Sequence, residues 1–375
     1  PENKAIELQN TPWHKTVVAD VAANIFNIAS GLDKTNKGVL EKLQEALFEL
    51  KPVEGVHKDI RKTNEASNND KLRDWSIFMD NYKKGVFETP TYFSYGFMKN
   101  NRLLQQGLLS PQRSSIVRHL LRSHEPVTYN EDNLYLFKAA VVYNFKGDLS
   151  NLSKDEMAKY FNNLVNLKVD YTNKAGVKTQ VSLMELAKEV SQLSNADNEN
   201  NTETINKLVE VLPYLKLGKE SIVEGMHLLQ GLVALGDYYD YHTGKADSFN
   251  SEVSVEIDGK TNGFAIGLMQ FPLMDDKTLE LFLNYTRTFF LKGNKELSES
   301  DVKLGKDQDA YNHLGTIIND MYSKSKAVYQ AYYSKKYQNE VSEQKLYLYD
   351  KANKALDYVF FNTPFYNMRN FAKNP

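Results

Sequence analysis

The sequence predicts a mostly helical protein of the α+β class. Two observations support this: helical periodicity runs through most of the chain, and one segment has the period of a strand. Residues 253–258 alternate Val253, Val255 and Ile257 with polar residues, which is typical of a half-buried strand. Apolar residues recur at three- and four-residue spacing in residues 17–30, 38–50, 131–145, 154–167, 182–194, 203–216, 219–240, 276–291, 310–335 and 343–360.

Three polar stretches interrupt the helical pattern and predict loops. They cover residues 64–70, which include Asn64 and Asn68, residues 195–202 and residues 294–308. Clusters of Asn, Asp and Ser favour turns because their short side chains compete with the backbone for hydrogen bonds. The helical segments on either side are therefore expected to be separate elements.

Length and composition limit the class of protein. A chain of 375 residues is long enough for two or three packed units or for one large fold with several lobes. Its 41% hydrophobic and 25% charged residues match ordinary soluble proteins and argue against wholesale disorder. The absence of cysteine excludes thiolate zinc sites, iron–sulfur clusters and cysteine nucleophiles. Without a long apolar run or a leader-like start, the sequence predicts a soluble, intracellular protein that does not associate with membranes.

One part of the chain is strongly basic although the net charge is only -2. No acidic residue lies between Glu88 and Glu125. A one-signed patch of this kind can hold a nucleic-acid backbone, and a solvated basic face is the alternative. The cations of this acid-free block are Lys99, Arg102, Arg113, Arg118 and Arg122.

The histidines do not predict a metal site. His119 and His124 are five residues apart, and Asp237, Asp240 and His242 lie close together. Neither spacing matches a familiar set of metal ligands on one helix face. We therefore expect these residues to be solvated positions near helix ends.

A carboxylate at the end of the predicted strand suggests a magnesium site. Asp258 is followed at once by Gly259, so its oxygens and an unencumbered backbone carbonyl could face one divalent ion. An ordinary Asp-Gly turn is the alternative. Near the end of the sequence, Thr363 and Pro364 can begin a helix on which Arg369 and Lys373 share a face. Two cations so placed could grip a triphosphate.

Taken in chain order, these segments resemble the single-subunit RNA polymerase family typified by phage T7, mitochondrial and phage N4 enzymes. That family has a Phe-x-x-Pro segment, a Thr/Asp-x-x-Gly-Arg motif, and then Pro-Gln and a basic residue before Leu-Leu. Met98 and Asn101 stand where the family has Asp and Gly, so only the arginine of the second motif is kept. The matching positions are Phe87, Pro90, Arg102, Pro111, Gln112, Arg118, Leu120 and Leu121.

The strongest part of the resemblance is motif A, a strand ending in Asp-Gly with a second glycine four residues on. Asp258, Gly259 and Gly263 fit it without a gap. The resemblance implies that Asp258 binds two catalytic Mg²⁺ ions and that the Gly259 carbonyl helps to hold one of them. Arg369 and Lys373 fit the first half of motif B and would bind the nucleotide.

The resemblance also implies partners. The tyrosine of motif B and the His-Asp pair of motif C are not found in the 375 residues. One aspartate cannot hold two metal ions, so we expect a heterodimer like the two-subunit RNA polymerases of N4-like phages. A second subunit would supply the remaining motifs, and DNA template, RNA product and nucleoside triphosphates would bind, with a single-stranded DNA-binding helper as a further partner. The implied nucleic-acid contacts are Arg102, Gln112, Arg113 and Arg118.

The expected architecture is an incomplete right-hand polymerase in the cytoplasm of an infected bacterial host. Residues 1–86 would form a thumb-like helical region, 87–275 the palm, and 276–375 the beginning of the fingers. Two other functions stay open: a helical scaffold without catalysis, in which Asp258 belongs to a turn, and a fragment of a family A-like DNA polymerase.

Overall fold

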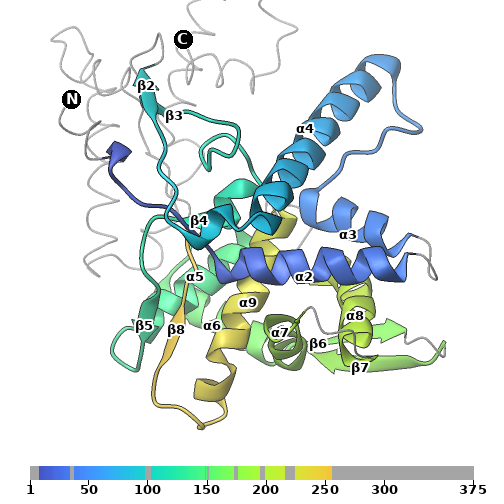
Figure 1. Cartoon of the computed structure of the whole chain (residues 1–375). Helices are drawn as coiled ribbons and strands as arrows, with labels where there is room; N and C mark the ends of the chain where they lie inside the picture. The colour runs from blue at the N-terminus through green and yellow to red at the C-terminus, as the bar shows by residue number, and fades with distance from the viewer. Residues whose placement is uncertain are drawn as a thin grey trace, which may run out of the picture. The chain divides into compact units, whose positions relative to one another are not determined.

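The computed structural model describes residues 8–33, 38–97, 103–147, 149, 152–172, 176–194, 199–215 and 224–255. All of these except residues 152 and 153 belong to one compact unit that runs to residue 256. Within this part of the chain the protein is mostly helical with small sheets, as the sequence predicts (Figure 1). The division at residues 86 and 275 stays a prediction. The predicted site residues Arg102, Asp258, Gly259, Arg369 and Lys373 lie outside the described residues, as do the segments predicted beyond residue 255.

Eight α-helices fall within the described residues. Most of the predicted helices among them begin and end within four residues of their expected bounds. The helix predicted from residue 219 begins at Gly225, residues 219–223 lying outside the described residues, and the helix at 58–83 was not predicted. The helices are α2 (Val17–Leu32), α3 (Val39–Phe48), α4 (Lys58–Lys83), α5 (Leu134–Lys146), α6 (Lys154–Val165), α7 (Leu183–Ser191), α8 (Glu199–Leu215) and α9 (Gly225–His242).

The strands form four antiparallel pairs in the described chain. These are β1 (His14–Lys15) with β4 (Leu121–Arg122), β2 (Tyr95–Phe97) with β3 (Leu103–Gln105), β5 (Val127–Tyr129) with β8 (Phe249–Ser251), and β6 (Lys168–Thr172) with β7 (Lys178–Ser182). Two 3₁₀ turns, η1 (Val86–Glu88) and η2 (Val117–His119), complete the set.

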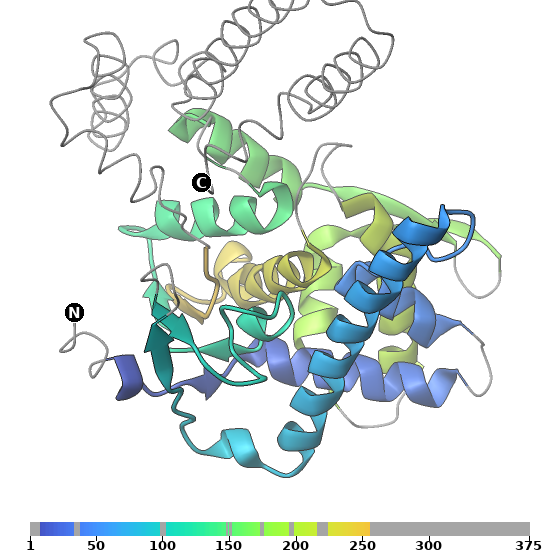
Figure 2. The same ribbon diagram turned by 90° about the horizontal axis from the view of Figure 1, so that it is seen from above.

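Helix α9 is the central element of the unit. It contacts α2, α3, α5, α7 and α8, and Figure 2 shows it between α5 and α2. Most of its residues are buried, because apolar and small side chains occur on all its faces. Its glycines allow close approach: a Cβ on Gly231 would lie 2.6 Å from the Phe145 ring, and one on Gly236 would lie 2.7 Å from the Ala187 carbonyl oxygen.

Two aromatic clusters form much of the core. One joins α2, α3 and α4, where Phe26 stacks on Phe48 at 5.1 Å and contacts Trp75 at 4.7 Å between ring centroids. The other joins α5, α9 and β8, where Phe137 lies 5.4 Å from Tyr238 and 4.8 Å from Phe249. Aromatic contacts of this kind add to the free energy gained from burial. The second cluster anchors β8, which directly precedes the predicted magnesium-binding segment.

The loop predicted at residues 64–70 is wrong, because α4 continues through it. The asparagines instead bind the segment that precedes α4. The Asn64 side chain donates to the Pro52 carbonyl at 2.7 Å. Asn68 both accepts from and donates to the backbone of Lys51, at 2.8 Å each. The predicted loop at 195–202 is also wrong in part, since its last four residues begin α8.

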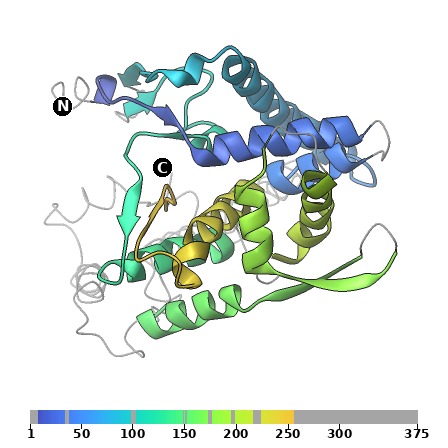
Figure 3. The ribbon, with the colours of Figure 1, turned by 60° about the horizontal axis from the view of Figure 1, so that its bottom comes forward.

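The predicted strand is displaced toward the N-terminus. Strand β8 lies beside β5, with Val127 opposite Ser251 (Figure 1, Figure 3). One more step would set Glu252 opposite Pro126, which has no N–H to donate. Residues 253–255 therefore lie outside a ladder, with Val253 buried and Val255 41% exposed. The rest of the predicted strand, 256–258, is outside the described residues.

No helix in the described ranges combines the length and the apolar character needed to cross a bilayer.

Candidate functional site

The longest described part of the acid-free block, from residue 103 to residue 122, is a folded connection between β3 and β4. Gln112, one of the predicted nucleic-acid contacts, lies on the loop after β3. Its side-chain oxygen accepts from the Gln105 backbone N–H at 2.6 Å, although the side chain is largely exposed. The buried Gln105 side chain in turn accepts from the Ser110 hydroxyl at 3.1 Å. Gln112 therefore closes this loop with one of its polar atoms.

The arginines of the block differ in their surroundings. Arg113 is exposed, as a phosphate contact requires. Arg118 is half-buried, and its Nε donates to the Ser114 carbonyl at 3.3 Å. Arg122 is different again, because its Nε binds the Glu252 carboxylate at 2.8 Å and only 13% of its side chain is exposed. The block is thus less basic than its sequence indicates.

The Arg122 to Glu252 pair ties three distant segments together. The other Glu252 oxygen accepts from the Val17 backbone N–H at 2.6 Å, at the first turn of α2. A carboxylate at this end of a helix is stabilised by the unpaired N–H groups and the helix dipole. Glu252 follows β8 directly, so β4, α2 and the chain leaving β8 are fixed against one another.

A second line of hydrogen bonds runs from η2 through α9 to the same chain. His119 Nδ1 lies 3.1 Å from the Gln230 side-chain oxygen. The Gln230 amide donates to the Ser254 hydroxyl at 2.8 Å, and the Asn144 amide donates to the Ser254 carbonyl at 3.1 Å. Ser254 precedes Asp258 by four residues. The chain at Ser254 is therefore held by side chains of α5 and α9, with Gln230 of α9 held in turn by His119 of η2.

The prediction that His119 is solvated is wrong, because η2 turns its ring into the interior. The side chain is only 3% exposed, and Val117 and Leu120 beside it in the sequence are buried as well. Burial, together with the nearby His227 and Arg118 side chains, lowers the pKa of His119 to about 3, although the hydrogen bond with Gln230 acts in the opposite direction. The imidazole is therefore neutral at physiological pH. His124 is exposed, as expected.

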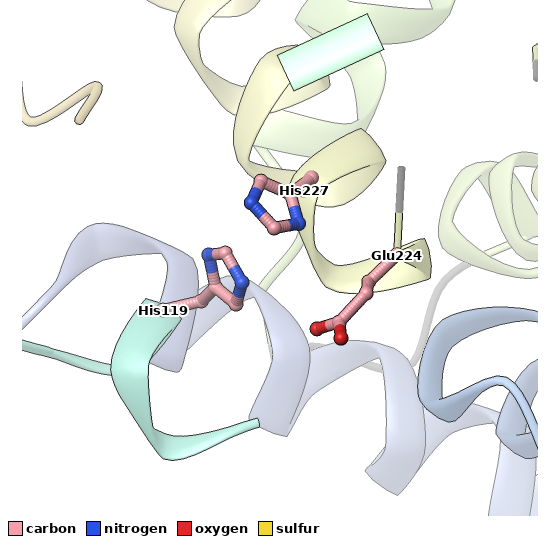
Figure 4. Close-up of side chains that lie close together, drawn as sticks. All are labelled: His119, Glu224 and His227. Atoms are coloured by element: carbon pink, nitrogen blue, oxygen red, sulfur yellow. The ribbon is translucent and has the colours of Figure 1, made fainter. Parts of the chain in front are cut away.

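His119, His227 and Glu224 come together at the start of α9. The two imidazole rings meet edge to face with their centroids 4.3 Å apart. One ligand atom from each of the three residues lies within 4.8 Å of the other two. Figure 4 shows the rings and the carboxylate directed into a common space. Because Nδ1 of His119 is engaged with Gln230, its Nε2 is the atom left, and Nε2 is buried with no hydrogen-bond partner.

The residues Asp237, Asp240 and His242, near the end of α9, differ in their exposure to solvent. Asp240 and His242 are exposed, as expected. The prediction that Asp237 is solvated is wrong, because its carboxylate is turned inward and accepts a hydrogen bond from the Ser251 hydroxyl at 2.7 Å. Burial, with a smaller contribution from the charge of Glu252, raises the pKa of Asp237 to about 7, although the hydrogen bond from Ser251 acts in the opposite direction.

The three-residue group at α9 is not the predicted magnesium site. Magnesium prefers oxygen ligands in an octahedral arrangement, whereas two imidazoles and a carboxylate suit zinc and other transition metals. Sequence reasoning missed this group because His119 is more than 100 residues from Glu224 and His227. The spacing of Glu224 and His227, three residues apart at a helix start, was the one available signal.

No family model, curated protein or solved structure matches this chain.

Proposed function

We propose that this chain is part of the catalytic core of a DNA-directed RNA polymerase of the single-subunit family. The observation that carries the proposal is the sequence of motif A, in which Asp258 and Gly259 follow an alternating segment and Gly263 comes four residues later. It occurs downstream of Arg102, Gln112 and Arg118, in the order that the family keeps.

The hydrogen-bonded contacts of the described unit support this proposal. In such an enzyme the metal-binding aspartate needs a rigid approach beside the segment that contacts nucleic acid. The Arg122 to Glu252 pair and the His119, Gln230 and Ser254 line join these two parts of the chain. Arg113 is exposed on the same connection and is available to a phosphate backbone.

In the proposed mechanism Asp258 and the Gly259 carbonyl would hold magnesium together with a carboxylate of the proposed second subunit. The bound metal supplies activation of the 3′ hydroxyl and stabilisation of the leaving pyrophosphate. Arg369 and Lys373 hold the triphosphate, and Arg102, Arg113 and Arg118 position template and product. The second subunit that carries the remaining motifs, and action in the cytoplasm of an infected bacterium, belong to the same proposal.

The test is replacement of Asp258 in a reconstituted enzyme. The chain is co-purified with a polypeptide from the same genome that carries the Tyr-Gly and His-Asp motifs, and a primed DNA template is extended with labelled triphosphates. Asp258→Asn should reduce nucleotide addition by at least about 10³-fold, because it removes a charge that the metal ions require. Asp247→Asn, at an exposed position on the loop after α9, is the matched control.

Binding of the primed template distinguishes loss of chemistry from loss of folding. Asp258→Asn should bind it as the parent complex does, since Asp258 contacts metal rather than phosphate in this mechanism. Extension that survives Asp258→Asn would contradict the assigned role. A scaffold protein would not bind the template at all, and a preference for deoxynucleoside triphosphates would instead identify a DNA polymerase.

A further inference from the structure

A buried histidine with an unused ring nitrogen requires an explanation. Polar atoms in protein interiors almost always have a hydrogen-bond partner, and each exception costs free energy. Nε2 of His119 is such an exception among the described residues. It lies in the space that His119 shares with the His227 ring and the Glu224 carboxylate (Figure 4). A cation in this space would give Nε2 the partner that the protein does not.

The hydrogen bonding of His119 suits a metal ligand. Histidines that bind a metal commonly donate their other ring N–H to an oxygen, which fixes the ring and the tautomer. His119 Nδ1 has this partner in the Gln230 side-chain oxygen at 3.1 Å. The Gln230 amide is itself held by the Ser254 hydroxyl at 2.8 Å. With the proton on Nδ1, the lone pair of Nε2 is directed into the shared space.

The other two residues of the group, Glu224 and His227, lie on the first turn of α9. Glu224 is the N-cap of α9, and its carbonyl accepts from the His227 backbone N–H at 3.1 Å, so the two residues are fixed on one turn. Their side chains therefore project from the same end of the helix. Gly225 between them allows α9 to approach α3, since a Cβ there would lie 2.0 Å from the Ala46 carbonyl oxygen.

We propose that His119, His227 and Glu224 bind one zinc ion that links η2 to the start of α9. Two imidazoles and one carboxylate are a known zinc ligand set with a fourth position for water. Donor atoms around a tetrahedral zinc are roughly 3.4 Å apart, so the three side chains close inward from separations of up to 4.8 Å. None of these three residues belongs to the proposed magnesium site at Asp258, and the inference does not depend on the proposed function.

The first measurement is zinc binding by the full chain, prepared without a histidine tag and freed of metal by dialysis against a chelator. Zinc is titrated against a chromophoric competitor, and unfolding is followed by circular dichroism with and without zinc. We expect one zinc per chain and a higher melting temperature in its presence, because a ligand of the folded state stabilises it. Cobalt in place of zinc should give the visible absorption of a tetrahedral site.

Variants assign the ligands. His227→Gln and Glu224→Gln should each weaken zinc binding by at least about 10-fold, since each removes a ligand. His242→Gln is the matched control, because it lies on the same helix but is exposed. Glu224 is only half-buried, so its variant is expected to fold even where His227→Gln does not. Absence of zinc binding by the parent chain, or unchanged binding by a folded Glu224→Gln variant, would overturn the site.

Discussion

At Asp237 a single carboxyl group makes stability depend on pH. Its pKa is about 7 in the folded chain against 3.8 in the unfolded chain, because burial and the charge of Glu252 disfavour ionisation. A raised pKa in the folded state stabilises the protein fully below pH 3.8, and this contribution is lost as the pH rises through about 7. The ionised carboxylate at pH 8 is therefore a cost of folding.

Asp237→Asn should remove that cost. The interval between the two pKa values corresponds to at most about 4 kcal/mol, and partial exposure reduces it, so we expect the variant to be about 1 to 3 kcal/mol more stable at pH 8. The gain should shrink as the pH falls to 5, where the folded parent holds the proton. Urea unfolding at both pH values measures it, with exposed Asp240→Asn as control. An equal effect at both pH values would contradict the assignment.

The sequence could locate the acid-free block but not the environment of each residue in it. In the sequence Arg122 stands in a segment without acidic residues, which indicates an unpaired cation. In the structure it is paired with Glu252, 130 residues away. The sequence around His119 gives no sign of its burial, because a 3₁₀ turn directs its ring inward. Both facts depend on long-range contacts, which periodicity does not contain.

At the scale of elements, the helices with a regular apolar face were predictable and α4 was not. Helix α4 is mostly polar, and of its 26 residues only Asn64, Trp75, Phe78 and Met79 are buried. Its first half is held by side-chain bonds to residues 51–52 rather than by an apolar face. Asparagine favours loops when its side chain bonds to its own local backbone. Here the asparagines bond to residues 51–52 instead, so they are compatible with a helix and the predicted loop does not form. The hairpin of β6 and β7 was not predicted either.

Two glycines in helices provide a direct test of packing around α9. Gly236→Ala should destabilise the protein by about 1 to 3 kcal/mol, because its Cβ would lie 2.5 Å from the Ser191 hydroxyl and 2.7 Å from the Ala187 carbonyl oxygen. Gly31→Ala in α2 meets nothing within 4 Å and should stabilise by about 0.5 to 1 kcal/mol. Denaturant unfolding of both variants measures this. Equal effects would show that α9 is less closely packed than the structure indicates.

At the scale of the whole molecule, the contacts seen in the described unit can be compared with the residues of the proposed polymerase site. Both aromatic clusters, the Arg122 to Glu252 pair and the three residues of the proposed zinc site lie before residue 256. The residues that the polymerase resemblance assigns to metal and triphosphate all come later in the sequence. The contacts described above and the residues proposed for metal and triphosphate binding therefore lie in different parts of the sequence.

A fragment of residues 1–256 should consequently fold without the rest. We expect a single cooperative thermal transition, because one continuous core joins α2, α3, α5, α7 and α8 around α9. We also expect the same zinc stoichiometry as the full chain, and no nucleotide addition with the partner polypeptide, because Asp258 is missing. Circular dichroism and zinc titration of the fragment provide the measurements. A fragment that unfolds gradually, or that precipitates when made alone, would show that residues after 256 are needed to complete the core.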